Sequence, residues 1–290
     1  MQAALAEQLT RLAQRLGARS GFTLDLGYPP TAENRPRWGY GRPPHEGVRK
    51  ALARHDDVYR HHLEIIAGYH DDLLAIDLHD RWGSDPCWLN AFLLGLDTAS
   101  LYALIRTWAP PRYVEVGSGY STKVIARARR DGGLSTTITS IDPNPRSEVD
   151  LLCDCVVRQP LETVDFGVFA ELQAGDVVFF DGSHRVFTNS DVTVFYLDIL
   201  PKLAPGVLVG IHDVLWPDDY VPEWAEYWFS EQYVLGAYLL AQAPWLVPLL
   251  ACNYVSGHAD LSQVLEPLWK EPALAGVDRR GFCLWLRIGP

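Results

Sequence analysis

Two carboxylates and two imidazoles directly follow two short apolar segments of this sequence. Asp181 and His184 come after the run VVFF, and His212 and Asp213 come after the run VLVGI. If these runs are neighbouring parallel strands, about 4.8 Å apart, the side chains that follow them emerge together at the carboxyl edge of a sheet. Asp181, His212 and Asp213 are then competent ligands for a divalent cation, and the carboxylate oxygens favour a hard ion such as Mg²⁺.

His184 lies three residues after Asp181 and offers a different chemistry. An imidazole with an ordinary pKa of about 6.5 can accept a hydroxyl proton at neutral pH, more readily where a cation has acidified that hydroxyl. Purely structural roles stay open for all of these residues. Asp181 can cap a turn, His184 can bond to a loop carbonyl, and residues 212–213 can form a satisfied pair at a strand end.

A second group of residues, EVGSGYST at 115–122, has the form of a strand that runs into a glycine loop and then a helix. Gly117 and Gly119 allow a tight turn and a close approach of the backbone to a ligand, and free N–H groups at the helix start face an anionic group. Asp142 ends the next apolar run and can bind both hydroxyls of a ribose. The loop departs from the dinucleotide fingerprint, because Thr122 occupies the position of the third glycine. Glu115 also suits a cofactor with an ammonium group better than one with a pyrophosphate.

The elements that position these residues alternate between short apolar runs and helical stretches from residue 109 onward. This alternation is typical of βαβ units, and almost fully apolar runs indicate parallel strands that are covered on both faces. The sequence therefore predicts an α/β fold. The predicted strands are 113–116, 137–141, 156–158, 177–180, 207–211, 247–255 and 282–288, and the main predicted helices are 46–69, 89–108, 121–130, 146–152, 166–172, 190–203, 224–240 and 261–269.

Glu115 to Thr122 together with Asp142 resembles motifs one and two of the class I S-adenosylmethionine-dependent methyltransferases, and the likeness extends over about residues 110–290. The resemblance implies a Rossmann-like seven-stranded sheet whose last two strands are antiparallel. It also implies that S-adenosylmethionine is the cofactor. The cofactor-binding residues implied are Glu115, Gly117, Ser118, Gly119, Tyr120, Ser121, Thr122, Asp142, Gln159, Leu161 and Asp181.

The two strand ends resemble those of the metal-dependent O-methyltransferases of the catechol and caffeoyl-CoA type, in which an Asp follows the fourth strand and an Asp-Asn pair follows the fifth. Asp181 matches the first of these ligands, and His212-Asp213 stands where Asp-Asn is expected, as in a smaller group of bacterial methyltransferases. The imidazole shifts the metal preference toward Mn²⁺, Fe²⁺ or Zn²⁺. His184 stands where these enzymes place a lysine base. The resemblance implies metal-assisted methylation of a small hydroxylated molecule, with His184, Asp181 and Asp213 as catalytic residues.

Two other functions remain open on the sequence. One is a NAD(P)-dependent oxidoreductase on a Rossmann-type sheet, and the other is an inactive scaffold protein that binds the cofactor. Methylation of nitrogen or carbon also stays open beside oxygen.

The composition limits the partners of this 290-residue chain. With 25 basic and 36 acidic side chains and a net charge of −11, its overall field repels the phosphate backbone and anionic membranes, so neither nucleic acid nor membrane is expected as a partner. A hydrophobic fraction of 48% excludes a disordered chain. Five scattered cysteines indicate no disulfide framework and favour a cytoplasmic location.

The predicted domains are an N-terminal helical extension over 1–108 and a catalytic domain over 109–290. Leucines at residues 5, 9, 12 and 16 form one apolar stripe, which favours docking on the rest of the chain or a homodimer through this helix. Trp38 and Tyr40, with the aromatic residues of 220–233, are expected to form a substrate lid in which Glu231 and Gln232 are the polar groups.

Overall fold

The computed structural model describes residues 35–80, 83–145 and 148–290. The chain divides into two compact units, Met1–Arg35 and Pro36–Pro290, and the description below concerns the second. The predicted leucine-striped helix lies outside the described residues. The helices before residue 109 pack against the sheet domain, and the division into domains at 108/109 stays a prediction.

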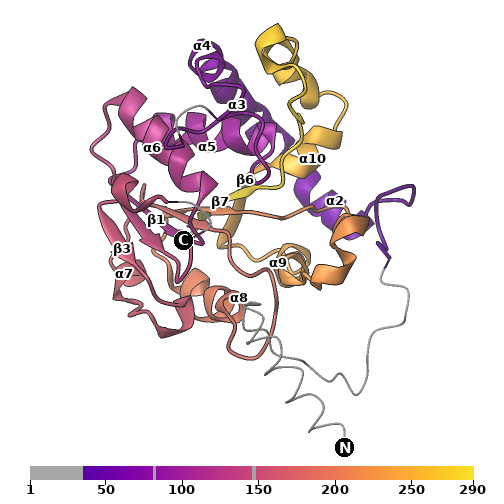
Figure 1. Ribbon diagram of the computed structural model, residues 1–290. Helices are drawn as coiled ribbons and strands as arrows, with labels where there is room; N and C mark the ends of the chain where they lie inside the picture. The colour runs from indigo at the N-terminus through magenta and orange to yellow at the C-terminus, as the bar shows by residue number, and fades with distance from the viewer. Residues whose placement is uncertain (1–34, 81–82, 146–147) are drawn as a thin grey trace, which may run out of the picture. The chain divides into compact units, whose positions relative to one another are not determined.

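The described residues form one seven-stranded sheet in the order β3-β2-β1-β4-β5-β7-β6, which confirms the predicted fold class (Figure 1). Strands β1 to β5 are parallel, and β7 runs antiparallel to both β5 and β6. The strands are β1 (Arg112–Val116), β2 (Thr137–Ile141), β3 (Cys155–Val157), β4 (Val177–Phe180), β5 (Leu208–Ile211), β6 (Leu246–Ala251) and β7 (Leu284–Ile288).

The register of the central strands aligns their carboxyl ends. Val116 of β1 lies opposite Ile141 of β2 and Phe180 of β4, and Phe180 lies opposite Ile211 of β5. Every residue of β4 and β5 is buried, as expected for strands that are covered on both faces. The polar residues that follow these strands in the sequence therefore begin at one common edge of the sheet.

Helices cover both faces of the sheet. In Figure 1, α3, α5 and α6 lie on one face, and α8 and α9 lie on the other. None of the helices in the described ranges is long and apolar enough to cross a membrane. The α-helices are α2 (Glu46–Ala53), α3 (Asp56–Ala67), α4 (His70–Leu74), α5 (Gly95–Trp108), α6 (Tyr120–Gly132), α7 (Gly167–Ala170), α8 (Asp191–Val194), α9 (Glu231–Leu240), α10 (Cys252–Gly257) and α11 (Glu266–Trp269).

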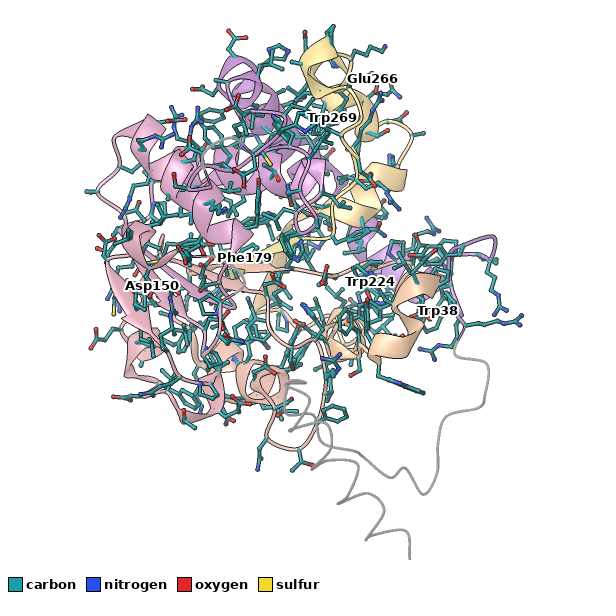
Figure 2. All side chains as sticks on the ribbon, in the orientation of Figure 1. Trp38, Asp150, Phe179, Trp224, Glu266 and Trp269 are labelled. Carbon is teal, nitrogen blue, oxygen red and sulfur yellow. The ribbon has the colours of Figure 1, made fainter. Side chains whose placement is uncertain are left out.

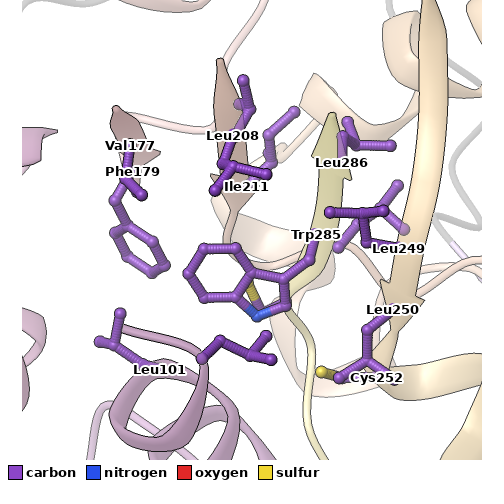
Figure 3. Packing of buried hydrophobic residues seen from close by; sticks show 14 of the residues in the cluster. Leu101, Val177, Phe179, Leu208, Ile211, Leu249, Leu250, Cys252, Trp285 and Leu286 are labelled. Atoms are coloured by element: carbon purple, nitrogen blue, oxygen red, sulfur yellow. The ribbon is translucent and has the colours of Figure 1, made fainter. Parts of the chain in front are cut away.

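The core between α5 and the sheet is built around the fully buried Trp285 of β7 (Figure 3). Its ring centroid lies 5.8 Å from that of Phe179 on β4, and its indole N–H donates to the Ser100 hydroxyl at 3.1 Å. A buried indole with a satisfied N–H fixes how α5 lies on the sheet. Because Asp97 is on the same helix, this packing also positions a carboxylate near the carboxyl edge.

Several predicted elements differ from the structure. The predicted strand 247–255 ends at Ala251, and residues 252–257 form α10 instead. The predicted helix 224–240 is divided into a 3₁₀ segment, Pro222–Tyr227, and α9, because Trp228 between them has a left-handed backbone with φ of 57°. The predicted helix 190–203 is α8 followed by π and 3₁₀ turns. In each case the apolar spacing is compatible with more than one local conformation.

Candidate functional site

The glycine loop follows β1 and makes direct backbone contact with the end of β4. Gly117 has φ of 80°, and a Cβ atom at this position would lie 1.8 Å from the carbonyl oxygen of Asp181. Only glycine fits such a left-handed turn against another backbone. The loop and the residue after β4 are thus held together by a contact that no side chain mediates.

Glu115 is buried in β1 and is held by three hydroxyl groups. Tyr113 and Ser121 donate hydrogen bonds to Oε2 at 3.3 and 2.9 Å, and the Thr122 hydroxyl donates to Oε1. Thr122 also accepts a hydrogen bond from the Gly119 N–H at 3.1 Å, so its hydroxyl closes the start of α6. Burial outweighs these bonds and raises the pKa of Glu115 to about 7. The side chains of Glu115, Ser121 and Thr122 thus support the loop from inside.

Asp142 follows β2 and faces the same loop. Its Oδ2 accepts the Ser118 N–H at 2.8 Å, and its Oδ1 accepts the Asn144 N–H at 2.7 Å. The Ser118 hydroxyl lies 2.6 Å from that of Ser140 on β2. Each carboxylate oxygen keeps a further lone pair, so Asp142 is pre-positioned as an acceptor for two hydroxyl groups.

The other predicted cofactor residues lie around this edge. The Tyr120 hydroxyl accepts the Cys87 N–H and donates to the Cys87 carbonyl at 2.8 Å, which joins α6 to the segment before α5. Gln159 is exposed and Leu161 is buried, both shortly after β3. Arg158, which the sequence does not single out, donates to the Ser140 hydroxyl at 3.0 Å and to the Asp142 carbonyl at 3.1 Å.

The residues that follow β4 and β5 form a second cluster at this edge. Single ligand atoms of Asp181, His212 and Asp213 all lie within 4.8 Å of one another. His212 Nδ1 is 3.5 Å from Asp181 Oδ1 and 3.4 Å from Asp213 Oδ1. His184 Nε2 lies 3.2 Å from both Asp181 Oδ1 and Asp213 Oδ2. The structure therefore brings together all four residues that the sequence singles out.

Two further carboxylates face the outer nitrogens of the imidazoles. Glu231 Oε2 lies 2.9 Å from His184 Nδ1, and Asp97 Oδ2 lies 3.5 Å from His212 Nε2. The sequence predicts Glu231 only in the lid and does not single out Asp97. A signal for Asp97 is its place in the apolar segment of helix α5, in which every residue from 95 to 105 is buried and a carboxylate needs a partner.

The charges of the cluster shift its pKa values in opposite directions. Burial lowers the pKa of His184, but Asp213, Asp181 and Glu231 outweigh it and raise the pKa to about 10. Burial raises the pKa of Asp181, but the two histidines outweigh it and hold that pKa below its ordinary value. An imidazole can bind a metal ion or accept a proton only in its neutral form. His184 must therefore lose its proton before it can do either. Its role as a general base stays a prediction.

The backbone holds two members of the cluster in a rare conformation. His184 has φ of 60° and Asp213 has φ of 56°. A non-glycine residue in the left-handed region costs about 1–3 kcal/mol and persists where the surroundings enforce it, as often happens at functional sites.

Aromatic residues from the predicted lid lie against the cluster. The Phe229 ring centroid is 4.8 Å from that of His184, and Trp224 and Tyr220 pack on Phe229. Figure 2 shows Trp38 and Trp224 on the same side of the molecule, opposite Asp150. Trp38 contacts Trp216, with 5.6 Å between centroids, so the segment after residue 35 lies against the segment after β5. Gln232 accepts the Leu215 N–H at 2.8 Å and anchors that segment.

Residues 114–214 match a family model that is described as a methyltransferase domain. The fold is that of the class I S-adenosylmethionine-dependent methyltransferases, and the predicted class of enzyme is confirmed. The matched residues include the glycine loop, Asp142, Asp181, His184, His212 and Asp213, whereas Asp97 and Glu231 lie outside them.

No curated protein matches the sequence. Among solved structures, the chain is similar to the methyltransferase PaMTH1 of Podospora anserina bound to SAH, with 14% identity over 87% of this chain and 100% of that one and a TM-score of 0.41. It is also similar to the plantazolicin methyltransferase BpumL in complex with SAH, with 11% identity over 84% and 99% and a TM-score of 0.43. A third is the O-methyltransferase TomG of Streptomyces achromogenes, with 15% identity over 84% and 90% and a TM-score of 0.34.

Proposed function

We propose that this methyltransferase domain transfers the methyl group of S-adenosylmethionine to a hydroxyl group of a small molecule, with the help of a divalent cation. One observation carries the proposal. The glycine loop at Gly117 touches the backbone of Asp181, so a loop suited to a nucleoside cofactor and a cluster suited to a cation share one sheet edge. Ligands bind at this edge in open α/β sheets.

The cofactor side of the proposal rests on two carboxylates. Asp142 is held by two backbone N–H groups and offers its remaining lone pairs to the two ribose hydroxyls. Glu115, buried with a pKa of about 7, supports the loop and becomes fully ionised when a cationic group lies nearby. A dinucleotide pyrophosphate has no such need, and this favours S-adenosylmethionine over NAD(P).

The cation side of the proposal rests on His212. The residue is 3% exposed, and neither of its ring nitrogens has a hydrogen-bond partner among the described residues. Buried imidazole nitrogens are rarely left without a partner. Nδ1 faces Asp181 and Asp213 only at 3.5 and 3.4 Å, so a cation between these three groups would give that nitrogen a partner. Asp181, His212 and Asp213 would hold the ion. When bound, it would orient and acidify the acceptor hydroxyl.

The acceptor side of the proposal rests on the aromatic residues beside the cluster. Tyr227 and Trp228 are half exposed, and Phe229 lies directly on His184. A small aromatic or otherwise planar alcohol would gain contact area there while its hydroxyl reaches the cluster. Positioning the acceptor in this way supplies much of the acceleration of an in-line transfer.

The experiment combines a panel of small phenols and alcohols with methyl-labelled S-adenosylmethionine. We expect transfer that stops on chelation and returns on addition of a divalent cation. Asp213→Ala should abolish transfer and leave cofactor binding nearly intact in calorimetry, whereas the exposed Asp260→Ala should change neither. Equal loss of transfer and cofactor binding in Asp213→Ala contradicts the cation role.

A further inference from the structure

We infer that Arg158 is a positioning residue for the cofactor, because its guanidinium group holds Asp142 and, through Ser140, the glycine loop in the arrangement that binds a ribose. The inference deepens the proposed function, since it rests on the binding of the ribose of S-adenosylmethionine by Asp142. Arg158 itself is given no contact with the cofactor. It acts through the groups that touch it.

The backbone of Asp142 is the first support. The ladder between β2 and β3 ends at Ile141 and Val157, so Asp142 lies just beyond it. The Asp142 N–H donates to the Val157 carbonyl at 3.0 Å, and the Asp142 carbonyl accepts from Arg158 Nη1 at 3.1 Å. Two consecutive residues at the end of β3 therefore hold both backbone groups of the residue that is proposed to bind the ribose.

The link to the glycine loop is the second support. The same nitrogen of Arg158 donates to the Ser140 hydroxyl at 3.0 Å, and that hydroxyl lies 2.6 Å from the Ser118 hydroxyl. A guanidinium group can only donate, so the Ser140 oxygen accepts from Arg158 and is free to donate its own proton to Ser118. The Ser118 N–H in turn donates to Asp142 Oδ2 at 2.8 Å. These four residues thus form a closed ring of hydrogen bonds at the end of β2.

The ion pair of Arg158 leaves the carboxylate of Asp142 available. Arg158 Nη2 donates to the carboxylate of Asp150, and among the described residues this is the carboxylate with which Arg158 pairs. Arg158 contacts the carbonyl of Asp142 and leaves both carboxylate oxygens with lone pairs for two ribose hydroxyls. The guanidinium group therefore fixes the position of Asp142 without competing with a ribose for it.

A brace between strands is the alternative role for such an arginine, and Arg129 is an example of one. Its guanidinium group pairs with Asp154 and donates to the carbonyls of Thr136 and Leu152 at 3.3 and 3.1 Å. These partners precede β2 and β3, at the opposite edge of the sheet from the glycine loop. The side chains of Arg129 and Arg158 are 26% and 27% exposed, so the two arginines are closely matched except for their place.

Calorimetric titration of the full chain with S-adenosylmethionine tests the inference. Arg158→Met keeps an unbranched side chain but removes its donors, and should raise the Kd about tenfold, the equivalent of one hydrogen bond. Arg158→Lys keeps one charged donor group and should recover part of this loss. Arg129→Met should bind with wild-type affinity, although both Met variants should unfold at lower urea concentrations than wild type.

A double-mutant cycle separates positioning from a purely structural role. If Arg158 acts through Asp142, the variant that combines Asp142→Asn with Arg158→Met should bind S-adenosylmethionine no more weakly than Asp142→Asn alone. Ser140→Ala removes the hydroxyl between Arg158 and Ser118, and should raise the Kd several-fold. It replaces Arg158→Met in these measurements if that variant does not fold.

The outcomes distinguish this inference from the proposed function. Wild-type affinity in a folded Arg158→Met, or an equal loss of affinity in Arg129→Met, overturns the inference and leaves S-adenosylmethionine as the cofactor. Losses that multiply in the double variant overturn it as well, as does unchanged affinity in Ser140→Ala where Arg158→Met does not fold. If wild type does not bind S-adenosylmethionine, the proposed function fails and the inference fails with it.

Discussion

The contact between Gly117 and Asp181 gives the most quantitative prediction. Replacing Gly117 by Ala places a Cβ atom 1.8 Å from the Asp181 carbonyl oxygen, whereas Cβ atoms essentially never come closer than 3.0 Å to such atoms. One of the two backbones must move by more than about 1 Å to relieve this overlap. That movement separates the glycine loop from the residue after β4.

The cost of the change can be worked out from the local bonds. A left-handed alanine costs about 1–2 kcal/mol by itself. The movement also strains two backbone hydrogen bonds, from Gly117 N–H to Ile141 at 3.0 Å and from Asp181 N–H to Val116 at 2.9 Å, each with a net contribution of about 1 kcal/mol. We therefore expect Gly117→Ala to lower the free energy of unfolding by about 3–4 kcal/mol.

The matched control is Gly133→Ala at the end of α6. Gly133 is also left-handed, with φ of 58°, but a Cβ atom there would meet nothing within 4 Å. We expect it to cost only the backbone part, about 1–2 kcal/mol. Urea unfolding of the two variants measures the difference, and calorimetry should show loss of cofactor binding in Gly117→Ala alone. Equal losses of stability in both variants would refute the steric argument.

Two further predictions concern buried carboxylates. Glu115 has a pKa of about 7 in the folded protein against an ordinary 4.5, so the folded state binds the proton more tightly and stability falls as the pH rises between these values. Urea unfolding should therefore show that Glu115→Gln is up to about 3 kcal/mol more stable than wild type at pH 8. The difference in the free energy of unfolding should disappear near pH 5. A difference that is the same at every pH would contradict this. Asp97→Ala leaves the N–H groups of Phe282 and Cys283 buried without their acceptor. It should therefore lower the free energy of unfolding by about 2–5 kcal/mol. A loss no larger than that of the exposed Asp260→Ala would count against this.

The strands at the centre of the sheet could be predicted because each is a short apolar run that is buried on both faces. For the same reason the carboxyl edge was predictable, since the residue after such a run must emerge there. The order of the strands was enough to place Asp142, Asp181, His212 and Asp213 at one edge. That order came from the resemblance to the methyltransferases.

The outer part of the cluster could not be predicted in the same way. Glu231 meets His184 across 47 residues of chain, through a segment whose 3₁₀ turn and left-handed Trp228 leave no periodic signal. Asp97 reaches His212 because α5 packs on the sheet through Trp285 and Ser100, a tertiary contact. The division of residues 190–203 into α, π and 3₁₀ turns also depends on packing, because the same apolar spacing is compatible with all three.

Calorimetric titration of the full chain with S-adenosylmethionine and, separately, with NAD tests the assignment of the cofactor most directly. We expect S-adenosylmethionine to bind at one site per chain and NAD not to bind. Asp142→Asn should weaken the binding of S-adenosylmethionine at least about tenfold, since one of the ribose acceptors becomes a donor. Binding of NAD in place of S-adenosylmethionine, or unchanged affinity in Asp142→Asn, would contradict it.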